Sequence, residues 1–536
     1  MASPSAAWNS IAPAIMAKKP SPNMSDNGEY RVMTLRFEVP LDHMDPLRET
    51  LTLHAELVYD YKRASCDDDS AAPHHRPAKP SSSSWNAILR RNKPYILYLC
   101  GGPGDGNKHL RIPGLNKFAL ERGYQVLYVD YRGTGKSQPV VDAATISRFR
   151  TAAAQAEYIS FFRQDNIARD LEAIRLCLSS TTSPSTKPTP HPLKWTIIGQ
   201  SFGGWIALTY LSFLPTSLSA IYLTAGLAPI TKSPTEVYTA LYRRVIARNE
   251  AYYRLYPADV PLVRAIATHI FHHGPIRTAS AGTAGRAYPV PPTITADGPQ
   301  GKDRLLTAQS FLTLGRVFGD DAARPTGFER VHRLVQRMAG DLDRGGALTG
   351  DTLACYAHRS VESFRLHRRP LYAVLHEAIY VPHRGAAPSA WAALRVGLVA
   401  HPGFSWLRDG DFSGDHGDAE GSGGGRLFFS GEMIFPFMLA AGGDEVRVFW
   451  EAAEVLSLKR DWGRLYDLDG LMGNREVKVR AMAFESDMYV DFGVSREVGG
   501  LVGGCEVVHG EDGWGHGALK EGGKTGVVLG RLFGEE

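Results

Sequence analysis

The chain has 536 residues, which exceeds the roughly 250–300 residues at which a single hydrophobic core usually stops growing, so we expect two folding units. Hydrophobic residues make up 43% and charged residues 22%, and 60 basic residues nearly balance 56 acidic ones, as in an ordinary globular protein. This charge balance excludes a strongly basic protein, and we expect neither a nucleic-acid nor a membrane partner. No run of residues approaches the roughly 18 apolar residues that a membrane-spanning helix needs.

The five cysteines are scattered along the chain and form no CxxC pair, which argues against both a disulfide framework and a zinc site. Residues 1–28 lack the charged start and the apolar stretch of a secretory leader, so we expect a cytoplasmic protein. The 18 histidines show no HExxH motif and no other ligand spacing. We therefore expect no metal and no cofactor.

Alternating apolar residues predict an antiparallel hairpin near the start of the chain and near one edge of a sheet. Apolar side chains recur at mostly every second position from Val32 to Val39 and from Leu51 to Leu57, which is typical of half-buried strands. We expect residues 1–28 to be flexible. Residues 62–92 are rich in Asp, His and Ser, and we expect them to form a disordered loop.

Three short apolar runs follow, at residues 95–100, 126–129 and 195–198, and a Gly or Asp comes directly after each. Such runs are typical of parallel strands that are buried on both faces. Between the second and third runs, apolar residues from Ile167 to Leu178 are spaced three or four apart, as in an amphipathic helix. The alternation predicts an α/β fold with a mostly parallel, doubly wound sheet.

Beyond residue 229 this alternation gives way to aromatic and Arg-rich helical patterns, for example at residues 238–256 and 311–338. Strand-like runs return at residues 477–484 and 505–509. We expect polar surface insertions at residues 179–192 and 409–425. The predicted organisation is a core in two parts, residues 1–228 and 446–536, with a mostly helical cap domain inserted at residues 229–445.

The central motif is Gly-Gln-Ser-Phe-Gly at residues 199–203. The string alone is weak evidence in a chain with 55 glycines, and it could be an ordinary glycine-rich turn. It lies, however, directly between a predicted strand and a predicted helix, where a tight turn pushes a serine clear of the sheet. We therefore predict that Ser201 is a nucleophile and that the backbone N–H of Phe202, at the start of the helix, stabilises an oxyanion.

A second oxyanion donor is expected in the loop after the first buried strand, which reads Gly101-Gly102-Pro103-Gly104. Glycines allow a backbone to approach a reacting carbonyl closely, and Pro103 restricts the loop. We assign the donor to the N–H of Gly102, with Gly101 as the alternative. Taken alone, this segment could also be a plain turn.

A serine needs a histidine to remove its proton, and the histidine needs a carboxylate to fix its tautomer. On this fold the chain order is serine, acid, histidine. Asp487 follows the strand-like run at 477–484 and is favoured as the acid over Glu485, at the strand end, and Asp491, further along. His516 is favoured as the base over His509, which lies nearer to its strand and is more typical of a structural histidine.

Five strings together resemble the prolyl (proline) iminopeptidase family, and they span nearly the whole chain. They are LCGGPG at 99–104, DYRGTGKS at 130–137, GQSFGG at 199–204, ESDMYVDF at 485–492 and WGHGALK at 514–520. The long cap with polar inserts is similar to the fungal-type members. The resemblance implies an α/β-hydrolase core, a helical cap, and a triad that falls on Ser201, Asp487 and His516. One departure is Cys100, which stands where many relatives carry histidine or glutamine.

The same resemblance implies that carboxylates of the cap hold the free amino end of the substrate. The strings LHEAIY at 375–380 and SGEMIFP at 430–436 resemble these segments, so Glu377 and Glu432 become candidate substrate-binding residues, together with Gly101. A buried ammonium does need compensating carboxylates. The alternative is that both glutamates are structural and form ion pairs with arginines nearby in the sequence, namely Arg365, Arg368 and Arg369.

The sequence therefore predicts a cytoplasmic serine aminopeptidase that releases an N-terminal residue, chiefly proline, from a small peptide or aminoacyl substrate. No cofactor is needed for this chemistry. The alternatives are an esterase or lactonase that uses the same triad on a non-peptide substrate, and a catalytically silent scaffold. The oligomeric state is left open.

Overall fold

The computed structural model describes residues 8, 10–17, 21–24, 30–60, 89, 93–182, 193–274, 276–278, 304–320, 325–358, 366–408, 412, 425–440 and 442–535. Of the expected disordered loop at residues 62–92, only residue 89 lies within these ranges, and most residues of the polar insertions at 179–192 and 409–425 lie outside them. In the segment 1–28, which we expected to be flexible, the described residues include two short strands, Ile15–Met16 and Ser21–Met24, that pair with the sheet.

A ten-stranded sheet forms the core, in the order β1-β3-β4-β6-β5-β7-β8-β11-β12, with β2 also paired to β3. The strands from β6 to β12 in this order run parallel, and β4 is antiparallel to β6. The bounds are β1 Ile15–Met16, β2 Ser21–Met24, β3 Arg31–Asp42, β4 Asp45–Tyr59, β5 Tyr95–Leu99, β6 Gln125–Val129, β7 Trp195–Gln200, β8 Leu218–Thr224, β11 Lys478–Ala483 and β12 Cys505–His509.

The sheet confirms the predicted mostly parallel α/β architecture and the leading antiparallel hairpin, which is β3 with β4. The three predicted buried runs are β5, β6 and β7, whose residues are all buried. Strand β8, which lies between β7 and β11, was not among the predicted strands. It separates the nucleophile strand β7 from β11, the strand with which the chain returns to the sheet.

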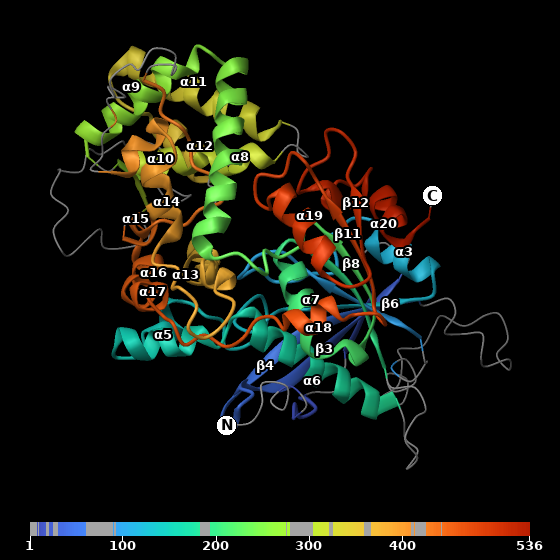
Figure 1. The fold of residues 1–536 in the computed structure, drawn as a ribbon. Helices are drawn as coiled ribbons and strands as arrows, with labels where there is room; N and C mark the ends of the chain where they lie inside the picture. The colour runs from blue at the N-terminus through green and yellow to red at the C-terminus, as the bar shows by residue number, and fades with distance from the viewer. Residues whose placement is uncertain are drawn as a thin grey trace, which may run out of the picture.

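Helices cover both faces of the sheet (Figure 1). Helix α6 (Gln164–Thr182) packs on α7 (Phe202–Phe213), which also contacts α18 (Leu468–Met472). Helix α20 (Thr525–Phe533) contacts α3 (Leu115–Glu121), β8 and β11, while α19 (Phe492–Leu501) contacts β11 and β12. The predicted apolar stripe of α6, from Ile167 to Leu178, is buried against this core.

The DYRGTGKS segment after β6 has a structural role in the core. The guanidinium of Arg132 is fully buried and donates two hydrogen bonds to the carboxylate of Asp170 on α6, at 2.6 and 2.7 Å. The carboxylate of Asp130 accepts backbone N–H groups of Asn107 and Lys136, at 2.5 and 2.8 Å. The segment therefore fixes the loop after β5, which carries Asn107, to the end of β6.

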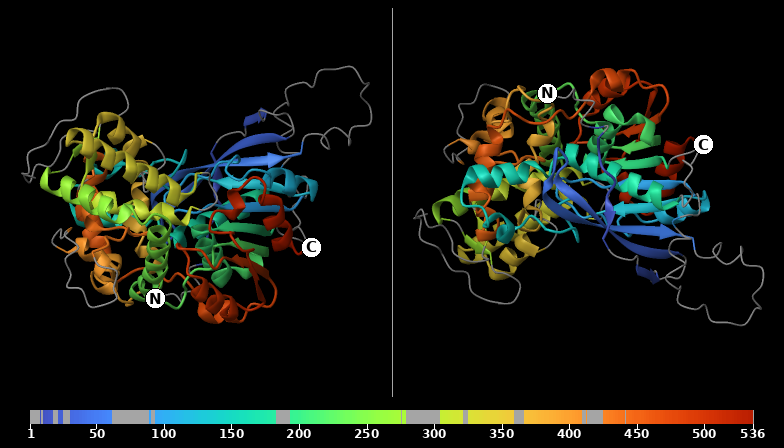
Figure 2. Two further views of the ribbon diagram at one scale, coloured as in Figure 1. Left: turned by 90° about the horizontal axis from the view of Figure 1, so that it is seen from above. Right: turned by 90° about the horizontal axis from the view of Figure 1, so that it is seen from below.

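A second, mostly helical body lies beside the sheet and is coloured green to orange in Figures 1 and 2. Its helices are α8 Pro234–Leu255, α9 Asp259–His272, α10 Ala308–Leu312, α11 Gly327–Gly345, α12 Gly350–His358, α13 Pro370–Leu375, α14 Ala392–Ala400, α15 Pro436–Ala440, α16 Asp444–Arg447 and α17 Trp450–Ser457. Ser233 and Glu236 form a capping box at the start of α8. Such a pair satisfies N–H groups that have no acceptor within the helix.

This body differs from the sequence prediction in two respects. The helical pattern at residues 311–338 is interrupted, because α10 ends at Leu312 and is followed by the 3₁₀ helix η3 (Thr313–Gly319) before α11 begins. A short antiparallel pair, β9 (Ile276–Thr278) with β10 (Arg304–Leu306), was also not predicted.

The helical body meets the core at the loops that follow the parallel strands. A Cβ atom added to Gly104, after β5, would lie 3.0 Å from the backbone N of Tyr372 on α13. The hydroxyl of Tyr489, after β11, donates a 2.6 Å hydrogen bond to the carbonyl of Arg316 on η3. The carboxyl edge of the sheet is therefore closed by helices of the inserted body.

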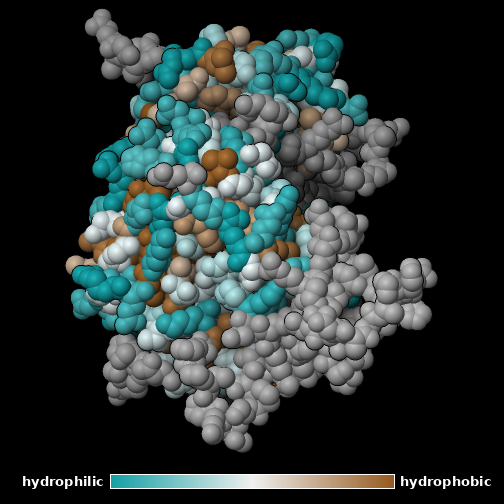
Figure 3. Space-filling model, turned by 90° about the vertical axis from the view of Figure 1, so that its right-hand side faces the viewer, coloured by the Kyte–Doolittle hydropathy of each residue, from teal (hydrophilic) through white to brown (hydrophobic). Residues whose placement is uncertain are grey.

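The coloured part of the surface in Figure 3 mixes polar and apolar side chains. Among the helices of the described segments, none combines the length and the apolarity needed to cross a bilayer.

Candidate active site

Ser201 lies on the tight turn between β7 and α7. Its backbone has φ 54° and ψ −127°, a conformation that costs an L-residue on the order of 1–3 kcal/mol and that persists only when the surroundings impose it. Gly203 is part of those surroundings, since a Cβ atom there would lie 2.1 Å from the carbonyl oxygen of Leu99. The turn therefore has the strained strand-to-helix geometry in which a serine side chain is exposed for reaction.

The loop after β5 lies directly against this serine. A Cβ atom added to Gly101 would lie 3.1 Å from Ser201 Cβ and 3.5 Å from Ser201 Oγ. Phe202 is the first residue of α7, so its N–H has no acceptor within the helix. The structure thus brings Phe202 and Gly101, the alternative oxyanion donor, to the nucleophile turn, whereas a Cβ atom on Gly102 would meet Gly104 and Asp105.

Cys100, the departure from the family pattern, is fully buried behind the loop. Its carbonyl oxygen accepts a 3.0 Å hydrogen bond from the hydroxyl of Tyr131. Burial raises the pKa of its thiol to about 11, so the side chain is neutral near pH 7. Tyr131 therefore holds the backbone at the start of the oxyanion loop, and the Cys100 thiol donates to the carbonyl oxygens of Asp105 and Gly106 further along the same loop, at 3.9 and 4.0 Å.

Asp487 and His516 are in contact. His516 Nδ1 lies 2.8 Å from Asp487 Oδ2, while the other carboxylate oxygen accepts the backbone N–H groups of Tyr489 and Val490, at 2.8 and 3.1 Å. The ring of Tyr489 packs edge-on against the imidazole, with 4.8 Å between centroids. A carboxylate at Nδ1 favours the tautomer whose Nε2 can accept a proton.

The alternative residues considered from the sequence lie elsewhere. Asp491 accepts the backbone N–H of Val494 as the N-cap of α19 and pairs with Arg244 at 3.0 Å. His509 is exposed at the end of β12, where its ring contacts Phe492. Among the described residues, Asp487 is the acid that contacts His516.

The remaining link, from histidine to serine, is less direct. The amide of Gln200, which precedes the nucleophile, donates to the carbonyl oxygen of His516 over 3.4 Å. The described residues show no hydrogen bond between Ser201 Oγ and the imidazole. Such bonds are often long in structures without substrate and shorten only when the substrate is bound.

Glu432 lies close to this centre. Its carboxylate accepts a 2.5 Å hydrogen bond from the hydroxyl of Tyr372 and forms a 3.1 Å ion pair with Arg316. Burial acts to raise the pKa of Glu432, but Arg316, His376, His516 and the Tyr372 hydroxyl together lower it below its usual value. Glu432 is therefore ionised at neutral pH and near enough to His516 for their charges to interact.

Glu377 has a different environment. Its two carboxylate oxygens accept the backbone N–H groups of Ala392 and Ala393, at 3.0 and 2.9 Å, at the start of α14. Burial raises its pKa. The described hydrogen bonds of Glu377 are thus with the start of a helix. No described contact joins Glu377 to Arg368 or Arg369, the arginines of the structural alternative that the structure describes. Arg369 instead pairs with Asp105 at 3.2 Å.

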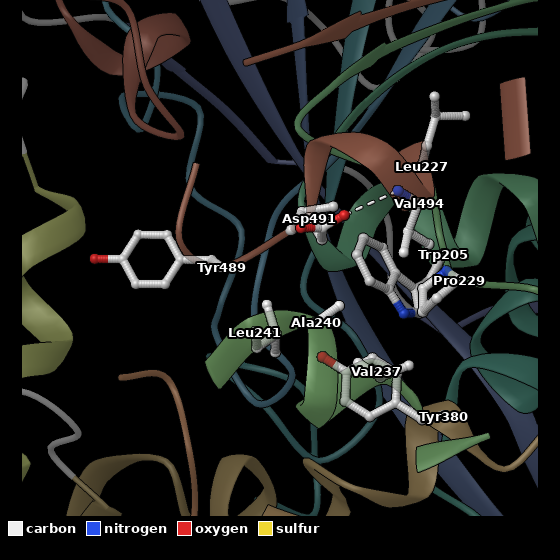
Figure 4. Close-up of a pocket in the computed structure, with 11 residues that line it drawn as sticks. Trp205, Leu227, Pro229, Val237, Ala240, Leu241, Tyr380, Tyr489, Asp491 and Val494 are labelled. Atoms are coloured by element: carbon white, nitrogen blue, oxygen red, sulfur yellow. Dashed lines mark hydrogen bonds between the residues drawn. The ribbon is translucent and has the colours of Figure 1, made fainter. Parts of the chain in front are cut away.

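A small, mostly apolar hollow of about 20 Å³ lies beside the site (Figure 4). Trp205 of α7, Leu241 of α8, Tyr380 and Tyr489 contribute to its walls. It shares Tyr489 with the imidazole, but no predicted triad residue is among the described residues that line it. The hollow is therefore adjacent to the proposed centre rather than part of it.

Comparisons with known proteins bear on this arrangement. A model of the alpha/beta hydrolase fold family matches residues 94–288. A proline iminopeptidase from Aeromonas sobria is 35% identical over 465 residues, which cover 86% of this chain and 87% of that protein. The chain belongs to the proline iminopeptidase family.

A second relative, named proline iminopeptidase aneH, from Aspergillus aculeatus, is 29% identical over 510 residues, which cover 94% of each chain. Among solved structures, homoserine o-acetyltransferase from Staphylococcus aureus matches 94% of this chain and 95% of its own, with 13% identity and a TM-score of 0.39. The family membership confirms the α/β-hydrolase fold and the class of serine hydrolase that the sequence predicted.

Several residues around the site were not found from the sequence. Arg316 and Tyr372, the partners of Glu432, come from helical segments with no recognisable motif. Lys520 lies within the WGHGALK string but was not assigned a role. Across the described residues, no group of three or more His, Cys, Asp or Glu side chains could hold a metal ion.

Proposed function

We propose that this protein is a serine aminopeptidase that releases an N-terminal residue, preferentially proline, from peptides. Ser201 is the nucleophile, His516 the general base and Asp487 the residue that orients it. The observation that carries the proposal is the 2.8 Å contact between His516 Nδ1 and Asp487 Oδ2, on loops that follow two neighbouring parallel strands. Carboxyl ends of parallel strands are where active sites of open α/β sheets form.

The chemistry follows from these positions. His516 Nε2 takes the proton of Ser201 Oγ, and Oγ attacks the carbonyl carbon of the N-terminal residue. The N–H groups of Phe202 and Gly102 stabilise the oxyanion. The imidazolium then gives its proton to the leaving nitrogen as the C–N bond breaks. Water, deprotonated by His516, hydrolyses the acyl-enzyme and restores Ser201.

An aminopeptidase must also recognise a free amino end, and we assign this role to Glu432. Its carboxylate is ionised, and its charge interacts with that of His516. A buried ammonium is stabilised by such a carboxylate and would be strongly destabilised without one. We assign to Glu377 the support of α14, because both of its oxygens accept backbone N–H groups there.

The test is hydrolysis of proline p-nitroanilide by the wild type and by Ser201→Ala, with labelling of both by a fluorophosphonate. Hydrolysis and labelling are both expected in the wild type and lost in the variant. Equal rates in the two proteins would refute the assignment of Ser201. Hydrolysis of acyl esters with no hydrolysis of any aminoacyl anilide would favour the esterase alternative.

A further inference from the structure

Tyr489 contacts both the acid and the base of the proposed triad. Its backbone N–H donates a 2.8 Å hydrogen bond to Asp487 Oδ1. Its ring packs edge-on against the imidazole of His516, with 4.8 Å between the centroids and 74° between the planes. In Figure 4 this ring points away from the other labelled residues of the hollow. The ring therefore extends from the hollow toward the histidine.

The imidazole needs a contact of this kind. The 2.8 Å contact between His516 Nδ1 and Asp487 Oδ2 fixes one corner of the ring but not its plane. The torsion that turns a histidine ring has a broad energy minimum, so the ring can tilt about this contact and carry Nε2 away from Ser201. Catalytic side chains must be held within about 0.5 Å and 10–20° of the productive geometry, which requires packed neighbours. Tyr489 is such a neighbour.

The inserted body in turn holds the ring of Tyr489. The hydroxyl donates a 2.6 Å hydrogen bond to the backbone carbonyl of Arg316 in η3, and the guanidinium of Arg316 lies 5.8 Å from the ring centroid. Gly319, the last residue of η3, lies against the same ring, since a Cβ atom there would be 2.6 Å from Tyr489 Cζ. The backbone of Tyr489 is thus fixed at the acid and its hydroxyl at η3. Because the acceptor is a main-chain carbonyl, any side chain at position 316 keeps it.

We propose that Tyr489 is a positioning residue, through which η3 of the inserted body holds the imidazole of His516 in its catalytic orientation. This inference rests on the proposed function, because it takes His516 as the general base. In this role Tyr489 acts on the base and not on the substrate. Its loss therefore lowers kcat for every acyl group that Ser201 accepts and leaves KM nearly unchanged.

The test measures kcat and KM of Tyr489→Phe and Tyr489→Leu on proline p-nitroanilide and on p-nitrophenyl acetate, whose acyl group has neither a ring nor an amine. Tyr489→Phe keeps the ring and loses one hydrogen bond, so kcat is expected to fall by about two-fold to ten-fold. Tyr489→Leu also loses the planar ring, and its kcat is expected to fall on the order of a hundred-fold. The losses should be similar on the two substrates, with KM unchanged.

Tyr253→Phe supplies the matched control. The hydroxyl of Tyr253 also donates to a backbone carbonyl of the inserted body, that of Leu427, at 2.5 Å, but no described contact joins Tyr253 to the triad. We expect Tyr253→Phe to lower the melting temperature about as much as Tyr489→Phe does and to leave kcat unchanged. The low-field proton NMR signal of His516 Nδ1, which depends on its hydrogen bond to Asp487, is a second measurement. It should weaken in Tyr489→Leu and persist in Tyr253→Phe.

Three results would overturn the inference. The first is an unchanged kcat in Tyr489→Leu, or in Tyr489→Phe if the leucine variant folds poorly. The second is a loss on the proline anilide alone or a rise in KM, which would assign Tyr489 to the substrate pocket. An equal loss of kcat in Tyr253→Phe is the third, because it would show general destabilisation. A wild type that hydrolyses the acetate but no aminoacyl anilide would instead refute the proposed aminopeptidase function, and the comparison on the acetate would still decide the role of Tyr489.

Discussion

Replacement of Glu432 by Gln removes one negative charge from the proposed amine site and leaves the shape of the side chain nearly unchanged. Two effects then act on a substrate ammonium. It loses a hydrogen bond to a charged group, which contributes roughly 1.5–3 kcal/mol. It also faces Arg316, whose ion pair with Glu432 at 3.1 Å is lost. We expect a total loss of about 3 kcal/mol in transition-state binding, which is a roughly hundred-fold decrease in kcat/KM.

The assay separates recognition from chemistry with two substrates. Proline p-nitrophenyl ester carries the amine, and cyclopentanecarboxylic acid p-nitrophenyl ester has a ring of the same size without it. We expect Glu432→Gln to lose about a hundred-fold on the first, and far less on the second, since the triad is untouched. Tyr372→Phe, which removes the 2.5 Å hydrogen bond to Glu432 but keeps its charge, is the matched control and should lose less. Equal losses on both esters would refute the amine-binding role of Glu432.

Two further predictions concern the triad and the core. Asp487→Asn should lower kcat on the order of 10³–10⁴-fold, because the amide favours the wrong tautomer of His516. Steady-state hydrolysis of proline p-nitroanilide would measure this change in kcat. A loss below ten-fold would contradict the orienting role of Asp487. Asp170→Ala leaves the fully buried Arg132 without its carboxylate, which should cost about 3–5 kcal/mol and lower the melting temperature; an unchanged melting curve would contradict this.

The nucleophile turn could be predicted because its determinants are local. A buried apolar strand, a glycine on each side of the serine and a helical run occupy adjacent stretches of sequence, and Ser201 has the strained backbone that this order requires. Asp487 and His516 are distant in sequence from Ser201. They could still be proposed, because loops that follow parallel strands meet at one edge of the sheet.

The environment of the cap residues could not be predicted in the same way. The partners of Glu432 lie 116 and 60 residues away along the chain. The spacing of apolar residues within a helix does not show which other helix it packs against. Arg369 was considered as a partner for the cap glutamates, but it pairs with Asp105, 264 residues away. The break between α10 and η3 also depends on tertiary packing, since a Cβ atom at Gly315 would lie 2.4 Å from the carbonyl oxygen of Ser430.

The division of the site between two parts of the chain has an evolutionary consequence. The three proposed catalytic side chains all come from loops of the sheet, whereas Glu432 comes from the segment before α15 and its partners Arg316 and Tyr372 from η3 and α13 of the inserted body. Substitutions in that body can therefore change which acyl group is accepted without moving the serine, the imidazole or its carboxylate. A lineage with this scaffold could acquire new substrates through the insertion alone, while the bond-breaking machinery stays constant.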